Sequence, residues 1–146
     1  MPSTHRARLL SIGELAERTG VAATALRYYD ELALVRPADR ASGRRRYTTS
    51  AVMEVGVIRL LGEVGFSLAE IGTLVRGGER TVRDDIVDRK LSELTEQLRR
   101  IEVARAVLEH ARACPAGDPL RCPRLRSIVE DRLRGLPLED SHARVH

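Results

Sequence analysis

Two cysteines near the end of the chain are the side chains best suited to binding a soft metal ion. Cys114 and Cys122 are separated by seven residues, in a loop constrained by one glycine and three prolines: Gly117, Pro115, Pro119 and Pro123. Thiolates select Cu(I) and its congeners over hard ions. Two-coordinate linear geometry suits a monovalent ion, whereas structural Zn²⁺ requires four ligands. The spacing therefore predicts a candidate metal site at Cys114 and Cys122.

The same two thiols are compatible with other roles. They can act as a redox switch, or they can be a structural remnant in a protein that answers to an unrelated effector or to none. An iron–sulfur cluster takes four cysteines, and one chain supplies two, which argues against a cluster. His110 lies one helical turn before Cys114 and is an alternative ligand. Because a single histidine on a charged helix face is usually solvated, we expect His110 to face solvent.

A second group of functional candidates lies in the first third of the chain, where arginines stand beside tyrosines. The stretch Ala25–Asp30 places Arg27 next to Tyr28 and Tyr29, and three consecutive arginines precede Tyr47. These side chains suit contacts with a phosphate backbone and a groove edge. The candidate DNA contacts are Thr24, Arg27, Tyr28, Tyr29, Arg44, Arg45, Arg46 and Tyr47, with Ala23 as a further neighbour of base edges.

The charge distribution supports an anionic partner for this region. Residues 1–50 hold nine arginines against five acidic residues, so they carry the whole formal charge of +4. A basic face on a small domain favours nucleic acid or an anionic membrane surface. The apolar runs are far shorter than the ~18–20 residues that a membrane span needs, so we expect a cytoplasmic protein with no membrane partner.

Helix signals place the arginines and tyrosines on a helix-turn-helix followed by a wing. Ser11 and Glu14 form a capping box, Gly20 ends the first helix, and a second helix continues to about Leu32. Helix breakers and alternating residues over 36–47 predict a short hairpin. At least two of the three arginines in that hairpin must lie in solvent or on phosphates. A third helix, capped by Thr49 or Ser50, is stopped by Gly65-Phe66-Ser67. A fourth follows with a capping box of Ser67 and Glu70, before a hinge at Gly77-Gly78.

A long helix over about 82–113 carries a heptad pattern. Its apolar positions recur at steps of four and three, with Arg105 interrupting the series, and the predicted interface residues are Val87, Leu91, Leu94, Leu98, Ile101 and Leu108. A lone helix of this length cannot bury such a stripe. The simplest partner is a second copy in a homodimer, and the alternative is packing against the chain's own domain.

The scarcity of aromatic residues and these helix signals predict a mainly α fold. We expect a winged helix-turn-helix DNA-binding domain at 9–76, a dimerisation helix at 80–113, an effector-binding loop and short helix at 114–134, and a flexible tail at 135–146. A nucleophile–base pair, an acidic dyad and a glycine-rich phosphate loop are all missing from the sequence, so we expect no enzymatic activity.

Four motifs in order resemble those of the MerR family of transcription regulators. They are Leu26–Leu32, Leu34–Pro37, Gly43–Tyr47 and Gly65–Ile71, at family spacing over residues 10–76. The resemblance implies DNA contacts by Arg27, Tyr28, Arg45 and Tyr47 and an antiparallel coiled coil between two copies. Arg44 departs from the family, in which an aromatic residue is common at this position.

The resemblance also implies a mechanism. Family members bind a promoter whose −35 and −10 elements are spaced too far apart, and effector binding lets the dimer distort the DNA so that RNA polymerase can use it. The Cys-x7-Cys-Pro spacing resembles the metal loop of the copper-sensing, CueR-like branch, which implies Cu(I), Ag(I) or Au(I) as effector. The segment 79–81 matches neither the serine nor the cysteine of metal sensors at that place.

Other functions remain open from the sequence. One alternative is a thiol-redox or small-molecule-responsive regulator, or a repressor, of the same fold. Another is a coiled-coil adaptor that binds no DNA. An adaptor would explain the heptads but not the arginine triplet beside the tyrosine pair, so we predict a DNA-binding regulator.

Overall fold

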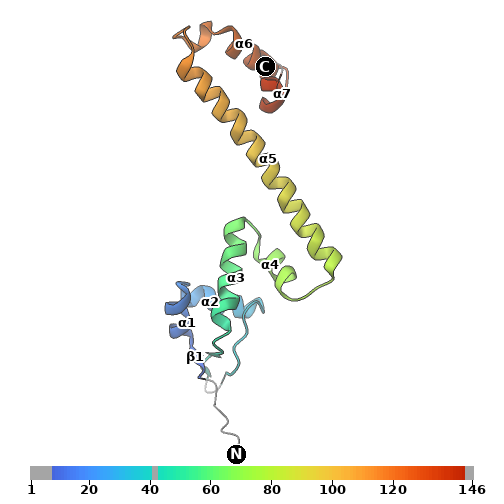
Figure 1. Ribbon diagram of the computed structural model, residues 1–146. Coiled ribbons are helices and arrows are strands. Elements are labelled where there is room, and N and C mark those ends of the chain that lie inside the picture. Colours follow the sequence, from blue (N-terminus) through green and yellow to red (C-terminus); the bar gives the residue numbers. More distant parts are fainter. Residues whose placement is uncertain (1–7, 41–42, 144–146) are drawn as a thin grey trace, which may run out of the picture. The chain divides into compact units, whose positions relative to one another are not determined.

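The computed structural model describes residues 8–40 and 43–143 and divides into two compact units, residues 1–86 and 87–146 (Figure 1). The first unit holds β1 (Leu10–Ser11), α1 (Ile12–Thr19), α2 (Ala23–Glu31), β2 (Arg46–Tyr47), α3 (Ala51–Val64) and α4 (Leu68–Val75). The helix α5 (Arg80–Ala113) begins there and runs into the second unit, which adds η2 (Pro119–Arg121), α6 (Pro123–Leu133) and α7 (Leu138–Ala143). The prediction of a mainly helical fold is confirmed.

Local capping chemistry sets the helix starts that the sequence predicts. The Ser11 hydroxyl accepts a hydrogen bond from the Glu14 amide at 3.2 Å, and the Glu14 carboxylate accepts one from the Ser11 amide at 2.7 Å. Ser67 and Glu70 repeat the arrangement at the start of α4. Gly20 ends α1 with φ 68°, a conformation that glycine adopts at little cost. Both predicted capping boxes are confirmed.

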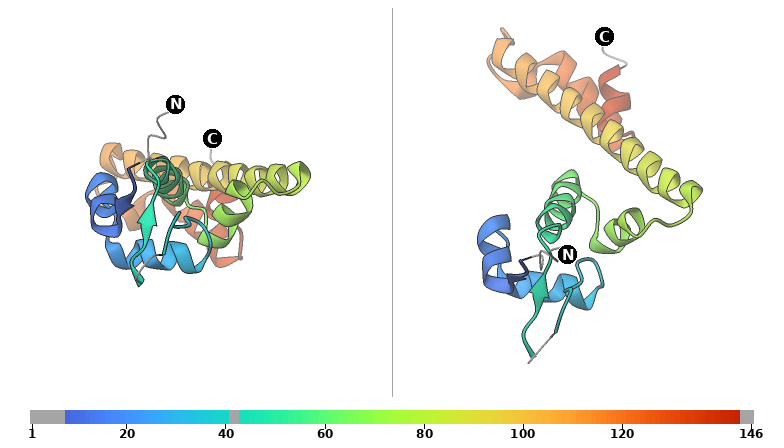
Figure 2. Two further views of the ribbon diagram at one scale, coloured as in Figure 1. Left: turned by 90° about the horizontal axis from the view of Figure 1, so that it is seen from below. Right: turned by 60° about the horizontal axis from the view of Figure 1, so that its bottom comes forward.

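The wing contains a shorter strand than the sequence predicts. Arg46 is bonded on both sides, through an antiparallel pair with Ser11 and through a bridge to Asp39. The strand is limited to Arg46–Tyr47 because its partner β1 ends where α1 begins (Figure 2). Residues 41–42 of the predicted hairpin lie outside the described residues.

The core of the first unit is built from aliphatic side chains and one tyrosine. Tyr47 is 0 % exposed and pairs with Leu10 across the small sheet. This corrects the prediction that Tyr47 contacts DNA, because its side chain belongs to the core. The remaining core residues are Leu10, Leu15, Leu26, Leu34, Val35, Ala51, Val55, Ile58 and Ile71.

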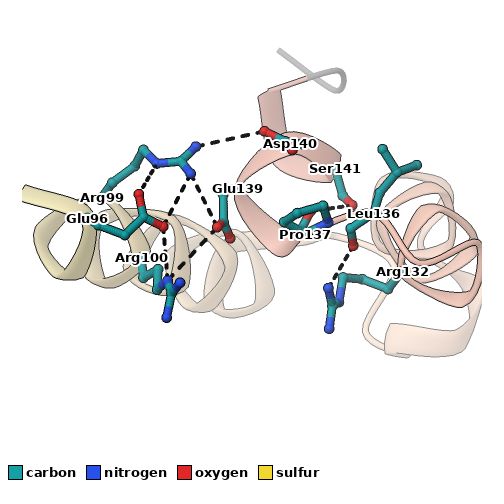
Figure 3. A network of polar contacts seen from close by, with 9 residues as sticks. All are labelled: Glu96, Arg99, Arg100, Arg132, Leu136, Pro137, Glu139, Asp140 and Ser141. Atoms are coloured by element: carbon teal, nitrogen blue, oxygen red, sulfur yellow. Dashed lines mark hydrogen bonds and ion pairs between the residues drawn. The ribbon is translucent and has the colours of Figure 1, made fainter. Parts of the chain in front are cut away.

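The part of α5 in the second unit has two unequal faces. One face is covered by its own chain: Arg99 reaches Glu139 and Asp140 of α7 at 3.3 and 3.8 Å, as Figure 3 shows, and His110 contacts Cys122. The opposite face is the predicted heptad seam, and its apolar residues are 39–70 % exposed: Val87, Leu91, Leu94, Leu98, Ile101 and Leu108. Within this unit, the chain therefore does not cover the seam with its own residues.

The end of the chain differs from the predicted flexible tail. Residues 138–143 form α7, which packs against α6. Ser141 is 0 % exposed, and its hydroxyl donates to the Pro137 carbonyl at 2.9 Å. A six-residue helix is held by these contacts and by the ion pairs to α5, which no local sequence pattern encodes. Among the described residues, no helix combines the length and the apolar character that crossing a membrane requires.

Candidate functional site

The candidate DNA contacts gather on one side of the first unit, where α2 faces the wing. Thr24 and Arg27 are exposed on α2, and Tyr28 is 50 % exposed. A groove of about 290 Å³ separates this helix from the wing and is lined by Ser11, Ile12, Arg27 and the segment 43–46. The groove brings Arg27 together with the arginine triplet, so the two cationic groups predicted from distant stretches share one surface. Phosphate oxygens are the chemistry that such a surface recognises.

The eight candidate DNA contacts nevertheless differ in exposure: some side chains are exposed, and others pack in the core or bind a partner within the unit. Arg44 is exposed, and Arg46 is half-buried. Tyr29 is also half-buried and packs against the core. Tyr47 lies fully in the core, and burial raises the pKa of its phenol. The surface available to DNA is thus smaller than the sequence pattern suggests.

A buried carboxylate holds the wing to α2. Asp30 is 6 % exposed and accepts a charge-assisted hydrogen bond from Arg45 Nε at 2.6 Å and another from Arg40 Nη2 at 2.6 Å. The hydrogen bond to Asp30 raises the pKa of Arg45. Charge-assisted bonds of this length are among the stronger polar contacts in proteins. Arg45 is therefore a bridge between the wing and α2, a role different from the predicted contact with DNA.

The role of Asp30 was not predicted from the sequence. Asp30 lies directly after the tyrosine pair, and its partners follow 10 and 15 residues later, outside any helical or hairpin spacing. The stretch that ends at Asp30 does contain a hint of this role. Asp30 is the acidic residue of a basic and aromatic stretch, and a buried carboxylate needs a cationic neighbour.

The second unit brings the two cysteines and a histidine together. The ligand atoms of His110, Cys114 and Cys122 all lie within 4.8 Å of one another. His110 lies in the last turn of α5, Cys114 directly follows that helix, and Cys122 is the residue before α6. The three line a pocket of about 100 Å³ with the apolar side chains Val107, Ala111, Pro119 and Leu125.

The electrostatics of this pocket favour a thiolate. Cys122 is 4 % exposed, and its sulfur lies 3.1 Å from His110 Nε2. That hydrogen bond, together with the backbone amide of Leu125 in the first turn of α6, lowers the pKa of Cys122 to about 7. Metals bind thiolates and not thiols. Two sulfurs and one imidazole nitrogen in an apolar pocket are a donor set that fits a soft cation.

His110 corrects one prediction. We expected a solvated histidine, but the loop after α5 turns back so that Cys122 meets the imidazole. The two residues are 12 positions apart, so their contact depends on how the loop between them folds.

Comparison with known proteins agrees with this architecture. Residues 10–77 match the family described as "MerR HTH family regulatory protein", and residues 52–111 match "MerR, DNA binding". The fold and the sites define a helix-turn-helix DNA-binding protein. More particularly, the chain belongs to the MerR family and is a DNA-binding transcription regulator.

Individual relatives span most of the chain. It is 31 % identical to the HTH-type transcriptional regulator HmrR of Rhizobium leguminosarum over 83 % of this chain and 98 % of that protein. It is 33 % identical to the HTH-type transcriptional regulator CueR of Salmonella typhi over 78 % of this chain and 88 % of that protein. Among solved structures, the EcmrR–DNA complex in EcmrR-RPo is similar with a TM-score of 0.56 and 27 % identity, covering 69 % of this chain and 37 % of that chain.

Proposed function

We propose that the chain binds a promoter as a homodimer and activates transcription when a soft monovalent cation, Cu(I), Ag(I) or Au(I), binds Cys114 and Cys122. Activation then follows by distortion of an overlong spacer between the −35 and −10 elements, which realigns them for RNA polymerase. The observation that carries the effector proposal is the approach of two thiols in one apolar pocket. The similarity to CueR and the Cys-x7-Cys-Pro spacing support it.

The dimer proposal rests on the bare face of α5. A seam of six apolar residues, each 39–70 % exposed, is expensive to leave in water. A second copy in antiparallel orientation buries the seam and places two α2 helices on two half-sites, as dimeric helix-turn-helix proteins require. The proposed DNA contacts are Thr24, Arg27, Tyr28 and Arg44, which are all exposed.

The proposed effector is tested by titrating the reduced protein with Cu(I) against a strong competing chelator. We expect wild type to compete far better than the variant with both Cys114→Ser and Cys122→Ser. Equal competition by the two proteins would remove the metal proposal. The proposed mechanism is tested by in vitro transcription from a promoter with a long spacer and from one with the spacer shortened. Cu(I) should raise output only from the long spacer.

Thiol redox sensing is the second candidate. The lowered pKa of Cys122 and the adjacent Cys114 favour it, because an oxidant such as a peroxide can remove two electrons from two neighbouring cysteines and leave a disulfide. Mass spectrometry after mild oxidation separates the two proposals. A disulfide that alters transcription without metal would support redox sensing.

A further inference from the structure

The pocket around the two cysteines contains a third donor that the proposed function does not require. We infer that His110 is a ligand of the bound cation, so that the site is a three-coordinate Cys2His site and not a linear pair of thiolates. This inference rests on the proposed function, because it concerns the same pocket. It concerns the number and kind of donor atoms, so it is tested by measurements different from those that test the proposed function.

The end of α5 brings two of the three donors close together. His110 lies in the last turn of α5, and Cys114, four residues later, is the first residue after that helix. Cys122 closes the set from the other side, where the loop ends and α6 begins. The three donor atoms already lie within 4.8 Å, so an ion can bind all three with small side-chain rotations.

The surroundings of the imidazole favour ligation over solvation. His110 is half-buried and lines the same apolar pocket as both cysteines. Its Nε2 lies 3.1 Å from Cys122 Sγ, which places that nitrogen on the side where a cation would contact the sulfur. A linear two-sulfur ion beside this nitrogen would leave the imidazole facing the ion without bonding to it.

The chemistry of the donor set agrees with a cation of the copper type. Thiolates select Cu(I), and imidazole is also a common copper ligand. Both cysteines would bind the ion as thiolates, and the imidazole would carry its proton on Nδ1 so that the Nε2 lone pair faces the metal. The hydrogen bond between His110 and Cys122 is then replaced by two bonds to one ion.

The competing role for His110 is that of a hydrogen-bond donor that only stabilises the Cys122 thiolate. The two roles differ in what surrounds the metal. A donor of a hydrogen bond leaves two sulfur neighbours on the ion, whereas a ligand adds one nitrogen neighbour. X-ray absorption spectroscopy counts these neighbours directly on the wild-type protein, and it needs no variant that could fail to fold.

The experiment loads the full-length reduced protein with one equivalent of Cu(I) and records its X-ray absorption spectrum. We expect two sulfur scatterers and one nitrogen scatterer in wild type, and two sulfurs alone in His110→Ala. Competition titration should show Cu(I) affinity at least about tenfold lower in His110→Ala. Glu109→Gln is the matched control. Its side chain is 57 % exposed beside Arg105, and its affinity and spectrum should match wild type.

The outcomes separate this inference from the proposed function. Two sulfurs without nitrogen in wild type, with equal Cu(I) affinity in His110→Ala, would overturn the third ligand and leave the cysteine site intact. Cu(I) binding no better than that of the double serine variant would overturn both. Intact two-sulfur binding with weaker affinity in His110→Ala would assign the hydrogen-bonding role and also reject ligation.

Discussion

The two units of this chain differ in how far their apolar side chains are buried and their charged side chains are paired. The first unit builds its own core: ten described residues are buried in it, the carboxylate of Asp30 has two arginine partners within the unit, and Met53 and Leu60 of α3 stay exposed. The second unit is open, because α6 and α7 cover one face of α5 and leave the apolar seam in contact with solvent. The first unit therefore forms a buried core within one copy, whereas the described residues of the second unit leave the apolar seam uncovered.

The largest expected effect comes from placing charge on the open seam. Leu94→Asp with Leu98→Asp should convert a dimer into a monomer in sedimentation experiments. Each buried leucine that is lost should cost about 2 kcal/mol or more, so promoter affinity should fall roughly a thousandfold. Ser92→Asp introduces a single aspartate at an exposed position of the same helix outside the seam, and this variant should remain dimeric. Unchanged dimerisation of the double aspartate variant would show that the seam is not the interface.

The first unit is tested at Asp30. Asp30→Asn removes the charge from a buried acceptor of two arginines, so the free energy of unfolding should fall by about 1–3 kcal/mol in urea titrations. The dimer should persist, because the seam is untouched. Glu31→Gln, on an exposed neighbouring residue, should leave the urea midpoint in place. Equal stability of the two variants would mean that the wing needs no ionic anchor.

The cysteine pocket predicts a pH dependence. The pKa of Cys122 is lowered to about 7, so the thiolate forms as pH rises through that value and is lost below it. Thiolate absorbance of metal-free Cys114→Ser should show this transition. His110→Ala in the same background should move the transition upward, because the imidazole hydrogen bond is the main cause of the lowering. A transition that stays in place without His110 would contradict that cause.

A smaller effect is expected at the exposed contacts. Arg27→Ala should weaken binding to promoter and random DNA alike, by roughly tenfold, because phosphate contacts position the protein without reading bases. Arg112→Ala removes the same charge from the second unit and should bind DNA like wild type. A loss confined to the specific promoter would assign base recognition to Arg27.

The features that the sequence predicts well are those encoded over a few residues. The capping boxes at Ser11 and Ser67 depend on partners three residues away, and the long helix α5 follows from a repeat within one segment. The burial of Tyr47 was missed because a two-residue strand has no alternation from which to assign faces. The contact of His110 with Cys122 and the helix α7 depend on where the loop after α5 turns, which local propensity does not determine.

The carboxylate of Asp30 also changes how the affinity of this protein for DNA should be interpreted. Each arginine that reaches a phosphate normally displaces condensed counterions, and log K then falls with log salt by ~0.9 for every phosphate neutralised. Arg40 and Arg45 already have an internal counterion. They contribute little to that slope as long as Asp30 retains them. The number of phosphates inferred from ionic-strength titrations will therefore be smaller than the number of arginines in the first unit.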